Sequence, residues 1–207
     1  MKGNLKRFFG LSILLIVSFT LLTGCLSNKK ADERGYIVKV GDQVPDFDIK
    51  MADGTTIPIK SLRGKYVMLQ FTASWCGVCR QEMPYIEKDI WQKYGKNPNF
   101  KLFGIDLKES AQKCDEFAKQ TMVTYPITLD EDGKIFELFC APDAGVTRNI
   151  IINPKGEIVM LTRLFDMEEF QTMVNFIDSS LKKYNPAVMG ISKTKKEILK
   201  KRISFFK

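Results

Sequence analysis

The sequence predicts an α/β fold in which helices flank a central mixed β-sheet. Apolar runs of strand length alternate with amphipathic helical patterns between Tyr66 and Gln120, as expected for parallel strands joined by helices. Further on, the apolar runs Asn149–Asn153 and Glu157–Leu161 are separated only by a Pro-Lys-Gly turn, which predicts an antiparallel hairpin. Parallel strands combined with a hairpin make the predicted sheet a mixed one.

The first central strand is predicted at Tyr66–Thr72, which is apolar nearly throughout and therefore typical of a buried strand. An amphipathic helix follows, and we expect Pro84 to kink it just past its first turns. Its apolar residues recur at three- and four-residue spacing: Val78, Met83, Tyr85, Ile86, Ile90 and Trp91.

The remaining elements are shorter, apart from the last helix. In chain order we expect a strand at Phe100–Asp106, a helix at Glu109–Gln120, a strand at Ile127–Leu129, a helical turn or two at Lys134–Phe139 and, after the hairpin, a helix at Met167–Tyr184. The last helix carries an apolar stripe of Phe170, Met173, Val174, Ile177 and Leu181.

The most informative motif is Trp75-Cys76-Gly77-Val78-Cys79, where the first strand meets its helix. Cysteines three residues apart on a first helical turn point to the same side, close enough to form a disulfide. A thiolate at a helix N-terminus faces unpaired N–H groups and the positive end of the helix dipole, which stabilise negative charge. We therefore predict a redox-active pair in which Cys76 is the more acidic and more exposed thiol.

A zinc site is the main alternative for cysteines at this spacing. The chain has no histidine, so only Cys114 and Cys140 could complete a four-thiolate set, and neither belongs to a second Cys-X-X-Cys. Covalent haem attachment needs a histidine where the chain has Arg80. Nucleophilic catalysis by a cysteine–histidine pair fails for the same reason. We therefore expect no metal and no cofactor.

Residues 1–24 have the pattern of an export signal peptide: a basic start, then an apolar run from Phe8 to Leu22. This run is shorter than the roughly 20 residues that span a bilayer, although an uncleaved signal anchor is the alternative. The sequence Leu22-Thr23-Gly24-Cys25 resembles the lipobox of bacterial lipoproteins. The resemblance implies cleavage before Cys25 and acylation of that residue, which would anchor the protein to a membrane.

The rest of the chain divides into a tether, one domain and a tail. Residues 25–36 are polar and predict a tether, residues 37–184 are of single-domain size, and residues 185–207 form a basic tail. The net charge of +8 comes from this end, because residues 181–207 hold nine basic residues and one acidic residue. The domain is therefore not basic, and we expect no nucleic-acid partner. The tail alternates apolar and cationic residues, which favours an amphipathic helix on an anionic membrane or on the domain.

Export also affects the two remaining cysteines, because disulfides persist outside the cytosol. We expect Cys114 and Cys140 to be buried, unpaired thiols, since free cysteine is among the most buried residue types. The alternative is a second disulfide between them.

Several motifs together resemble those of membrane-tethered thioredoxin-like proteins of the TlpA/ResA type, over roughly Val38 to Tyr184. The matching segments are Val40–Phe47, Leu62–Lys65, the Trp-Cys-X-X-Cys-Arg-X-Glu-Met-Pro run from Trp75 to Pro84, and Asn153–Gly156. The resemblance implies a thioredoxin-like fold with an N-terminal β extension. It also implies thiol-disulfide oxidoreductase activity.

In such an enzyme Cys76 would be the attacking thiolate and Cys79 the resolving thiol. Glu82 stands where ResA-like proteins have a glutamate that influences the active-site thiols; the alternative is an ordinary solvated helix carboxylate. Trp75 would shield the pair. With Trp75, the residues expected to contact the substrate are Gly77, Val78 and Thr147.

The chain departs from the family pattern at several positions near the thiols. Val78 replaces a proline, and Gln70 replaces the buried aspartate of thioredoxins. Thr147 stands in the place of a cis-proline, and because a non-proline cis bond costs about 3 kcal/mol we expect a trans bond there. Arg148 is expected to favour a thiolate or an acidic partner, or to form a surface ion pair.

The leading prediction is a thiol-disulfide oxidoreductase that acts on disulfides of other exported proteins. The resemblance favours the reductive direction, with electrons from an unidentified membrane donor. The predicted location is the cell envelope, facing the periplasm, with Leu26 after the acylated cysteine favouring the outer membrane. One alternative is a thiol peroxidase, although the Thr-X-X-Cys of peroxiredoxins reads Ala73-Ser74-Trp75-Cys76 here. The other is a non-catalytic redox sensor or binding module.

Overall fold

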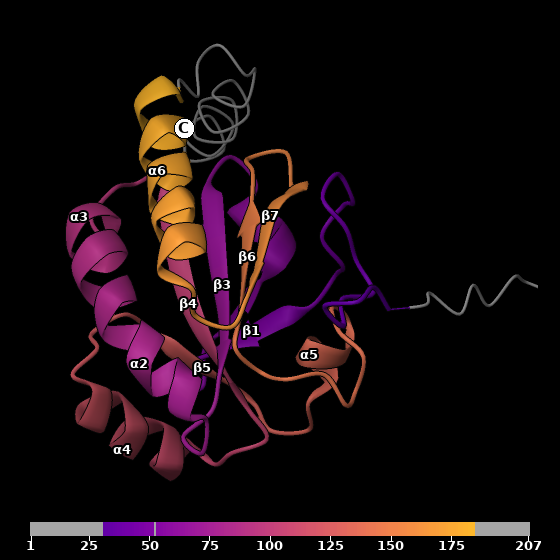
Figure 1. Cartoon of the computed structure of the whole chain (residues 1–207), viewed down its shortest axis with the longest axis vertical. Coiled ribbons are helices and arrows are strands. Elements are labelled where there is room, and N and C mark those ends of the chain that lie inside the picture. The colour runs from indigo at the N-terminus through magenta and orange to yellow at the C-terminus, as the bar shows by residue number, and fades with distance from the viewer. Residues whose placement is uncertain (1–30, 52, 185–207) are drawn as a thin grey trace, which may run out of the picture. The chain divides into compact units, whose positions relative to one another are not determined.

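The structure is a computed structural model that describes residues 31–51 and 53–184. These residues form a seven-stranded mixed sheet in the order β2-β1-β5-β4-β3-β6-β7 (Figure 1). The strands are β1 Asp48–Lys50, β2 Thr56–Pro58, β3 Tyr66–Thr72, β4 Phe100–Leu107, β5 Ile127–Asp130, β6 Arg148–Ile152 and β7 Ile158–Arg163. The predicted fold class, a mixed sheet flanked by helices, is confirmed.

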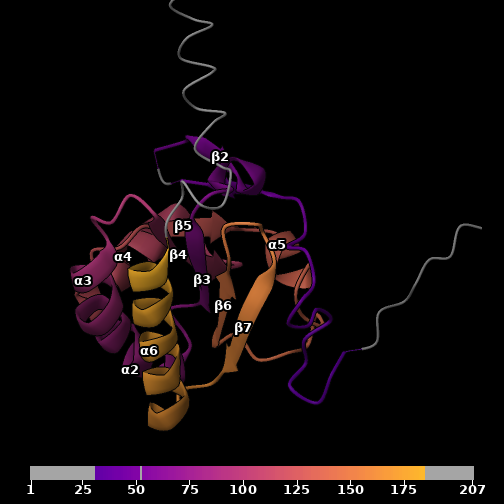
Figure 2. The ribbon, with the colours of Figure 1, turned by 90° about the horizontal axis from the view of Figure 1, so that it is seen from above.

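Helices cover both faces of the sheet. They are the 3-10 helix η1 Ile59–Leu62, α2 Gly77–Ile86, the π-helical turn η2 Glu87–Trp91, α3 Gln92–Tyr94, α4 Ala111–Thr121, α5 Lys134–Glu137 and α6 Met167–Lys183. Figure 2 shows α2, α4 and α6 on one side of the sheet and α5 on the other. This arrangement follows from the two right-handed crossovers β3-α2-β4 and β4-α4-β5, which place both connecting helices on the same face.

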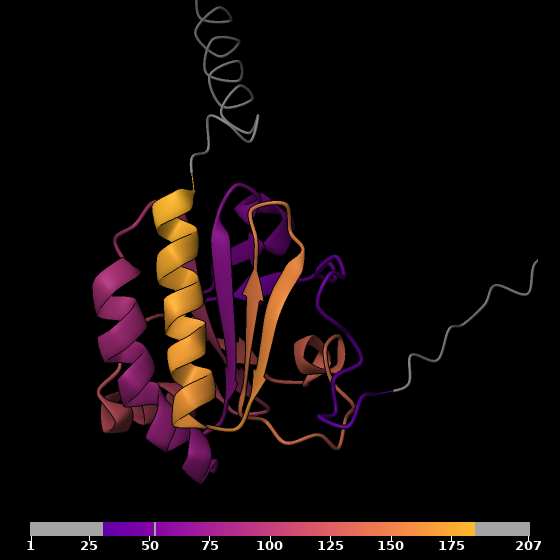
Figure 3. The same cartoon turned by 45° about the horizontal axis from the view of Figure 1, so that its top comes forward.

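The register brings the ends of three strands together at one edge of the sheet. β4 runs parallel to β3 and β6 runs antiparallel to it, so that Thr72 pairs with Asp106 and Phe71 pairs with Arg148. β6 and β7 form the predicted hairpin, which lies beside β3 (Figure 3). The carboxyl end of β3, the start of α2 and the start of β6 therefore meet at one place.

The central strands are buried, as their apolar sequences predict. Every residue of β6 is buried, and so is every residue of β3 after Tyr66. On the α5 side of the core, the ring of Phe71 packs edge-on against Phe136 and tilted against Phe139. A parallel strand buried on both faces gains stability from apolar side chains on each side.

Pro84 lies inside α2, and the predicted interruption of the helix takes the form of the π-helical turn that follows it. Within this turn, Glu87 accepts hydrogen bonds from the backbone N–H and the hydroxyl of Thr124, both at 2.8 Å. The indole N–H of Trp91 donates to the same hydroxyl at 3.0 Å. The π-helical turn η2 is thus hydrogen-bonded to the loop before β5.

The prediction of a tether over residues 25–36 is wrong for residues 31–36, because the compact unit begins at Ala31. Tyr36 is 1% exposed, and its hydroxyl donates to the Thr162 carbonyl at 2.5 Å. Arg34 forms an ion pair with Glu169 at 2.9 Å. The stretch is polar, as a tether would be, but its one aromatic ring, that of Tyr36, is buried in the domain.

The predicted signal peptide 1–24, the lipidated Cys25 and the basic tail 185–207 lie outside the described residues. Within residues 31–51 and 53–184, no helix has the length and apolar character needed to cross a bilayer.

Candidate active site

Cys76 and Cys79 form a disulfide at the start of α2, with their Cα atoms 5.3 Å apart. Cys76 is the N-cap residue of the helix, and its Sγ accepts a hydrogen bond from the Cys79 N–H at 3.1 Å. Cys76 is 8% exposed and Cys79 is fully buried, which confirms that Cys76 is the more exposed thiol. The more exposed of the two cysteines is therefore the one whose sulfur accepts a helix N–H.

The segment before the thiols is held by a carboxylate from the loop after β4. Glu109 accepts hydrogen bonds from the backbone N–H and the hydroxyl of Ser74, at 2.5 and 2.6 Å. Arg80 donates to the Ser74 carbonyl at 2.9 Å and lies over the Phe117 ring. This clamp fixes Trp75, which is 66% exposed and points into solvent beside Cys76.

Glu109 itself sits beside Asp106, a second acid that sequence reasoning did not single out. Burial and, to a lesser extent, the neighbouring Glu109 charge raise the pKa of Asp106 to about 7. Burial also acts on Glu109, but the Ser74 hydrogen bonds hold its pKa below the usual range. Near neutral pH, Glu109 is therefore ionised for its clamp while Asp106 keeps its proton over part of the range.

Thr147 faces both sulfurs from the opposite side. Its Oγ1 lies 3.1 Å from the Cys76 Sγ and 3.2 Å from the Cys79 Sγ, and the residue is only 3% exposed. No peptide bond among the described residues is cis, so the expected trans geometry at Thr147 is confirmed. The Thr147 carbonyl accepts the Leu164 N–H at 3.0 Å, which joins this loop to the end of β7.

Arg148 is fully buried, so the reading of a surface ion pair is wrong. Its side chain donates to the carbonyls of Gly145, at 2.7 Å, and Arg34, at 2.6 Å. Its guanidinium also lies 4.5 Å from the centre of the Tyr36 ring. Arg148 therefore anchors the Thr147 loop to the N-terminal segment and finds its partners there, not among acidic side chains.

Glu82 lies one helical turn beyond Cys79 on the buried face of α2, and at 1% exposure it is not the solvated carboxylate of the alternative reading. The Asn149 amide donates to it at 2.6 Å and the Gln70 amide at 3.4 Å. Burial raises the pKa of Glu82 to about 7, although both amide donors oppose the rise. A carboxyl group in this state can exchange a proton near neutral pH.

A buried polar network extends from Glu82 into the sheet. Gln70 and Asn149 are direct cross-strand partners on β3 and β6. The Tyr125 hydroxyl donates to the Gln70 amide oxygen at 2.7 Å, and Asn149 also donates to Thr162 at 2.9 Å. Sequence reasoning missed Asn149 and Tyr125. The available signal for Asn149 was a polar side chain at the start of an apolar run, whereas Tyr125, which precedes β5, had no such signal.

Of the predicted substrate contacts, the structure places Trp75, Gly77, Val78 and Thr147 around the disulfide. Gly77 is exposed, and a Cβ added there would meet nothing within 4 Å. Val78 is half-buried. Leu164, which sequence reasoning missed, joins this surface through its hydrogen bond to Thr147 and is half-exposed, with a left-handed φ of 63°. Apolar side chains thus flank the thiols on two sides.

Cys114 and Cys140 are both free and buried, as predicted, and the alternative of a second disulfide is wrong. Burial raises the pKa of each thiol to about 12, so neither is a reactive thiolate at neutral pH. The described residues contain no group of three or more side chains suited to hold a metal ion.

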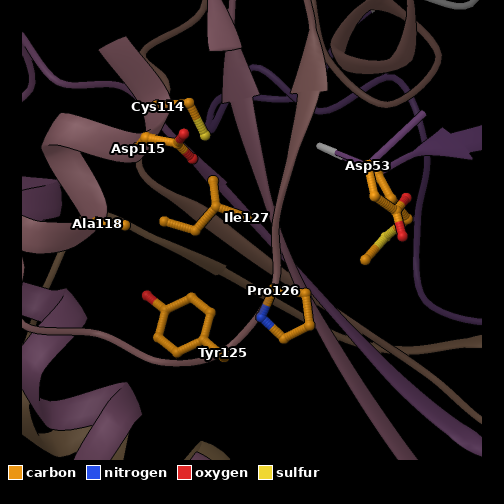
Figure 4. A pocket seen from close by; sticks show the side chains of 8 residues that line it. Asp53, Cys114, Asp115, Ala118, Tyr125, Pro126 and Ile127 are labelled. Atoms are coloured by element: carbon orange, nitrogen blue, oxygen red, sulfur yellow. The ribbon is translucent and has the colours of Figure 1, made fainter. Parts of the chain in front are cut away.

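Cys114 lines a cavity of about 350 Å³ between α4 and the start of β5 (Figure 4). Tyr125, Pro126 and Ile127 form much of its wall, and Asp53 and Asp115 also line it. Neither active-site cysteine lines this cavity. This cavity is therefore separate from the Cys76–Cys79 disulfide.

A model of the AhpC/TSA family matches residues 40–160. This chain belongs to the AhpC/TSA family. Among its relatives, thiol-disulfide oxidoreductase ResA of Oceanobacillus iheyensis is 34% identical over 162 residues, covering 76% of this chain and 81% of the relative. ResA of Bacillus subtilis is 26% identical, covering 77% of this chain and 86% of the relative.

Two solved structures are also similar to this chain. A solution structure from Bacteroides thetaiotaomicron, described as a candidate protein disulfide isomerase, is 54% identical with a TM-score of 0.70, covering 72% of this chain and 94% of that one. A crystal structure from Chlorobium tepidum, described as a candidate thiol:disulfide interchange protein DsbE, is 24% identical with a TM-score of 0.61 and covers 70% of this chain and 99% of that one, which supports the fold. The predicted ResA-type family, thioredoxin-like fold and thiol-disulfide oxidoreductase activity are confirmed.

Proposed function

We propose that the chain reduces disulfides of exported proteins while a lipid on Cys25 holds it at a membrane. The observation that carries the catalytic part is the pair of sulfurs in two environments. Cys76 caps a helix at the surface beside Trp75, and Cys79 is buried one turn before the buried Glu82. This asymmetry suits one sulfur to attack a substrate and the other to release it.

In the first step the Cys76 thiolate attacks one sulfur of the substrate disulfide. The substrate S–S bond breaks, a mixed disulfide with Cys76 forms, and the leaving substrate sulfur takes a proton from water. The helix N-terminus and the Cys79 N–H, which donates to the Cys76 sulfur, support the thiolate. Exposed Trp75 and Leu164 offer apolar surface to the polypeptide around the substrate cysteine.

In the second step Cys79 becomes the nucleophile. Glu82 takes the Cys79 proton, and the resulting thiolate attacks the Cys76 sulfur, which closes the Cys76–Cys79 disulfide and releases the second substrate thiol. Two electrons have then passed from the enzyme to the substrate. A raised pKa of about 7 suits Glu82 to this proton transfer, because it can accept the proton and return it near neutral pH.

The reductive direction requires a second dithiol that reduces the Cys76–Cys79 disulfide after each turnover. We propose a membrane-bound electron donor for this role, because an exported protein has no access to cytosolic reductants. The similarity to ResA oxidoreductases supports the assignment to disulfide exchange.

The membrane attachment rests on the lipobox-like sequence that ends at Cys25. Several acyl chains on one residue would anchor the protein stably, and Leu26 favours the outer membrane facing the periplasm. The basic tail of residues 185–207 would add attraction to an anionic surface. Labelling cells with a fatty-acid analogue should mark the parent in the membrane fraction, while Cys25→Ala should be unlabelled and released; equal labelling of both would contradict the anchor.

Insulin reduction tests the catalytic proposal. The full chain in detergent, supplied with dithiothreitol, should reduce insulin disulfides, and Cys76→Ser should abolish the activity. Cys79→Ser should trap mixed disulfides with the substrate instead. Peroxide consumption at a comparable rate would favour a thiol peroxidase, and the absence of both activities would favour a redox sensor or binding module.

A further inference from the structure

We propose that the Thr147 hydroxyl is a catalytic group that donates a hydrogen bond to the Cys76 thiolate and accepts one from the Cys79 thiol. The inference rests on the proposed function, because it assumes that Cys76 is the attacking sulfur. Thr147 stands where the family pattern has a proline, and a proline side chain has no hydrogen-bond donor. The threonine hydroxyl therefore adds a donor at this position.

The geometry places the hydroxyl between the two sulfurs. Thr147 Oγ1 is 3.1 Å from the Cys76 Sγ and 3.2 Å from the Cys79 Sγ, within hydrogen-bonding range of both. With 3% exposure, the hydroxyl has little water to compete for its proton. A buried hydroxyl needs a partner, and no other side-chain hydrogen bond of Thr147 is found among the described residues.

The loop that carries the hydroxyl is fixed on both sides. The Thr147 carbonyl accepts the Leu164 N–H, and the next residue, Arg148, is tied to the carbonyls of Gly145 and Arg34 and paired with Phe71 across β3 and β6. The β-branched side chain of Thr147 has few rotamers. The hydroxyl is therefore held in position before the disulfide opens.

The hydrogen bond from Thr147 to Cys76 is expected to be stronger in the reduced state than in the disulfide. A hydroxyl has one proton to donate and two lone pairs to accept. A disulfide sulfur is a weak acceptor, whereas a thiolate is a strong one, so the hydrogen bond to Cys76 strengthens when the disulfide is reduced. The Cys79 N–H donates to the same sulfur at 3.1 Å. The Cys76 thiolate thus receives two donors, and the Cys79 thiol can donate to a Thr147 lone pair.

The hydroxyl keeps its own proton throughout the cycle. Electrons pass only between sulfur atoms, and the Cys79 proton leaves to Glu82 as in the proposed function. When Cys76 is in the mixed disulfide, the Thr147 hydroxyl is free to stabilise the Cys79 thiolate as it forms, because it lies at the same distance from that sulfur. The Thr147 hydroxyl therefore stabilises the attacking thiolate in both steps, Cys76 in the first and Cys79 in the second.

Two matched variants test the proposal. Thr147→Val keeps the shape of the side chain and removes the hydroxyl, while Thr147→Ser keeps the hydroxyl. The pH dependence of Cys76 alkylation is measured on the reduced full chain by mass spectrometry. We expect Thr147→Val to raise the midpoint by about one pH unit, which makes alkylation about tenfold slower below the midpoint. Thr147→Ser should keep the midpoint of the parent.

An unchanged midpoint in Thr147→Val would overturn the proposal, and so would an equal shift in Thr147→Ser, which would indicate loss of packing. Thermal unfolding of each oxidised variant checks the fold, and Thr147→Ala replaces the valine variant if that one does not fold. Insulin reduction by the parent tests the proposed function separately. If the parent does not reduce insulin but Thr147→Val still raises the alkylation midpoint as predicted, only the proposed function is contradicted.

Discussion

Glu82 is a carboxylic acid held inside the protein by the amides of Asn149 and Gln70. Its pKa of about 7 makes it ionised, and therefore a base, only at the upper end of the neutral range. We expect the rate at which the mixed disulfide resolves to rise with pH through about 7 in the parent. In Glu82→Gln the rate should be about a hundredfold to ten-thousandfold lower and lack this inflection. Quenched-flow measurements of the decay of the mixed disulfide give this rate at each pH. An inflection that persists in Glu82→Gln would mean that another group titrates.

The same residue links stability to pH. Because the folded pKa of Glu82 is raised from 4.5 to about 7, the folded protein holds this proton more tightly than the unfolded chain does. The stabilisation is present in full below about pH 4.5 and is lost as pH rises through about 7. At about 1.4 kcal/mol for each pH unit, the loss is about 3 kcal/mol.

Glu82→Gln cannot lose a proton, so its free energy of unfolding relative to the parent should increase by about 3 kcal/mol between pH 4.5 and 8. Urea unfolding of both oxidised proteins over this range measures the difference. The buried Asp106 is present in both proteins, and its own titration therefore cancels. A difference that does not vary with pH would contradict the burial of an ionisable Glu82.

Residue-level prediction from sequence succeeded where the chemistry is local. The spacing of Cys76 and Cys79 and their place at a helix start were enough to predict the pair and its asymmetry. The burial of Glu82 could not be predicted, because it depends on Asn149, which reaches α2 only through the pairing of β6 with β3. The resemblance put Thr147 near the thiols, but the distances from its hydroxyl to the two sulfurs could be known only from the structure.

At the scale of elements, the long apolar runs and the short strand β5 were predicted well, whereas the positions of β1 and β2 were not. The first central strand has the predicted bounds, Tyr66–Thr72, because its residues are apolar apart from Gln70 and Thr72. Strands β1 and β2 have three residues each, too few to show a periodicity. They are held by pairing with each other and with β5, which only the folded sheet provides.

The π-helical turn after Pro84 gives a prediction at this scale. Glu87 satisfies both the backbone N–H and the hydroxyl of Thr124. Glu87→Ala would leave that N–H without its acceptor, and we expect a loss of about 1–3 kcal/mol in the free energy of unfolding. The exposed neighbour Lys88→Ala is the matched control and should stay within about 0.5 kcal/mol of the parent. Equal effects of the two substitutions in urea unfolding would show that the turn does not depend on this contact.

At the scale of the whole described unit, Arg148 joins the N-terminal segment to the active-site loop. Its buried side chain reaches the carbonyls of Arg34 and Gly145 and the ring of Tyr36. Sequence analysis placed residues 31–36 in a tether because they are polar, and it had no means of predicting a partner more than one hundred residues away.

Arg148→Met should therefore destabilise the protein by about 1–3 kcal/mol for each carbonyl that loses its donor. Hydrogen exchange should become faster in residues 31–38 and in the Thr147 loop, and stay unchanged in α4. The exposed Arg163→Met, on the neighbouring strand, serves as the control. Unchanged exchange in residues 31–38 of Arg148→Met would mean that other contacts hold this segment.

The central claim is that Cys76 and Cys79 form a catalytic dithiol that donates electrons to the disulfides of other proteins. Its most direct test is to equilibrate the full chain in graded redox buffers and measure the reduced fraction of Cys76 and Cys79 by alkylation and mass. The account predicts a single two-electron transition at a potential of about −270 mV, typical of a reductant. A transition at about −120 mV would indicate an oxidant, and no transition within the accessible range would indicate a structural disulfide; either result would contradict the account.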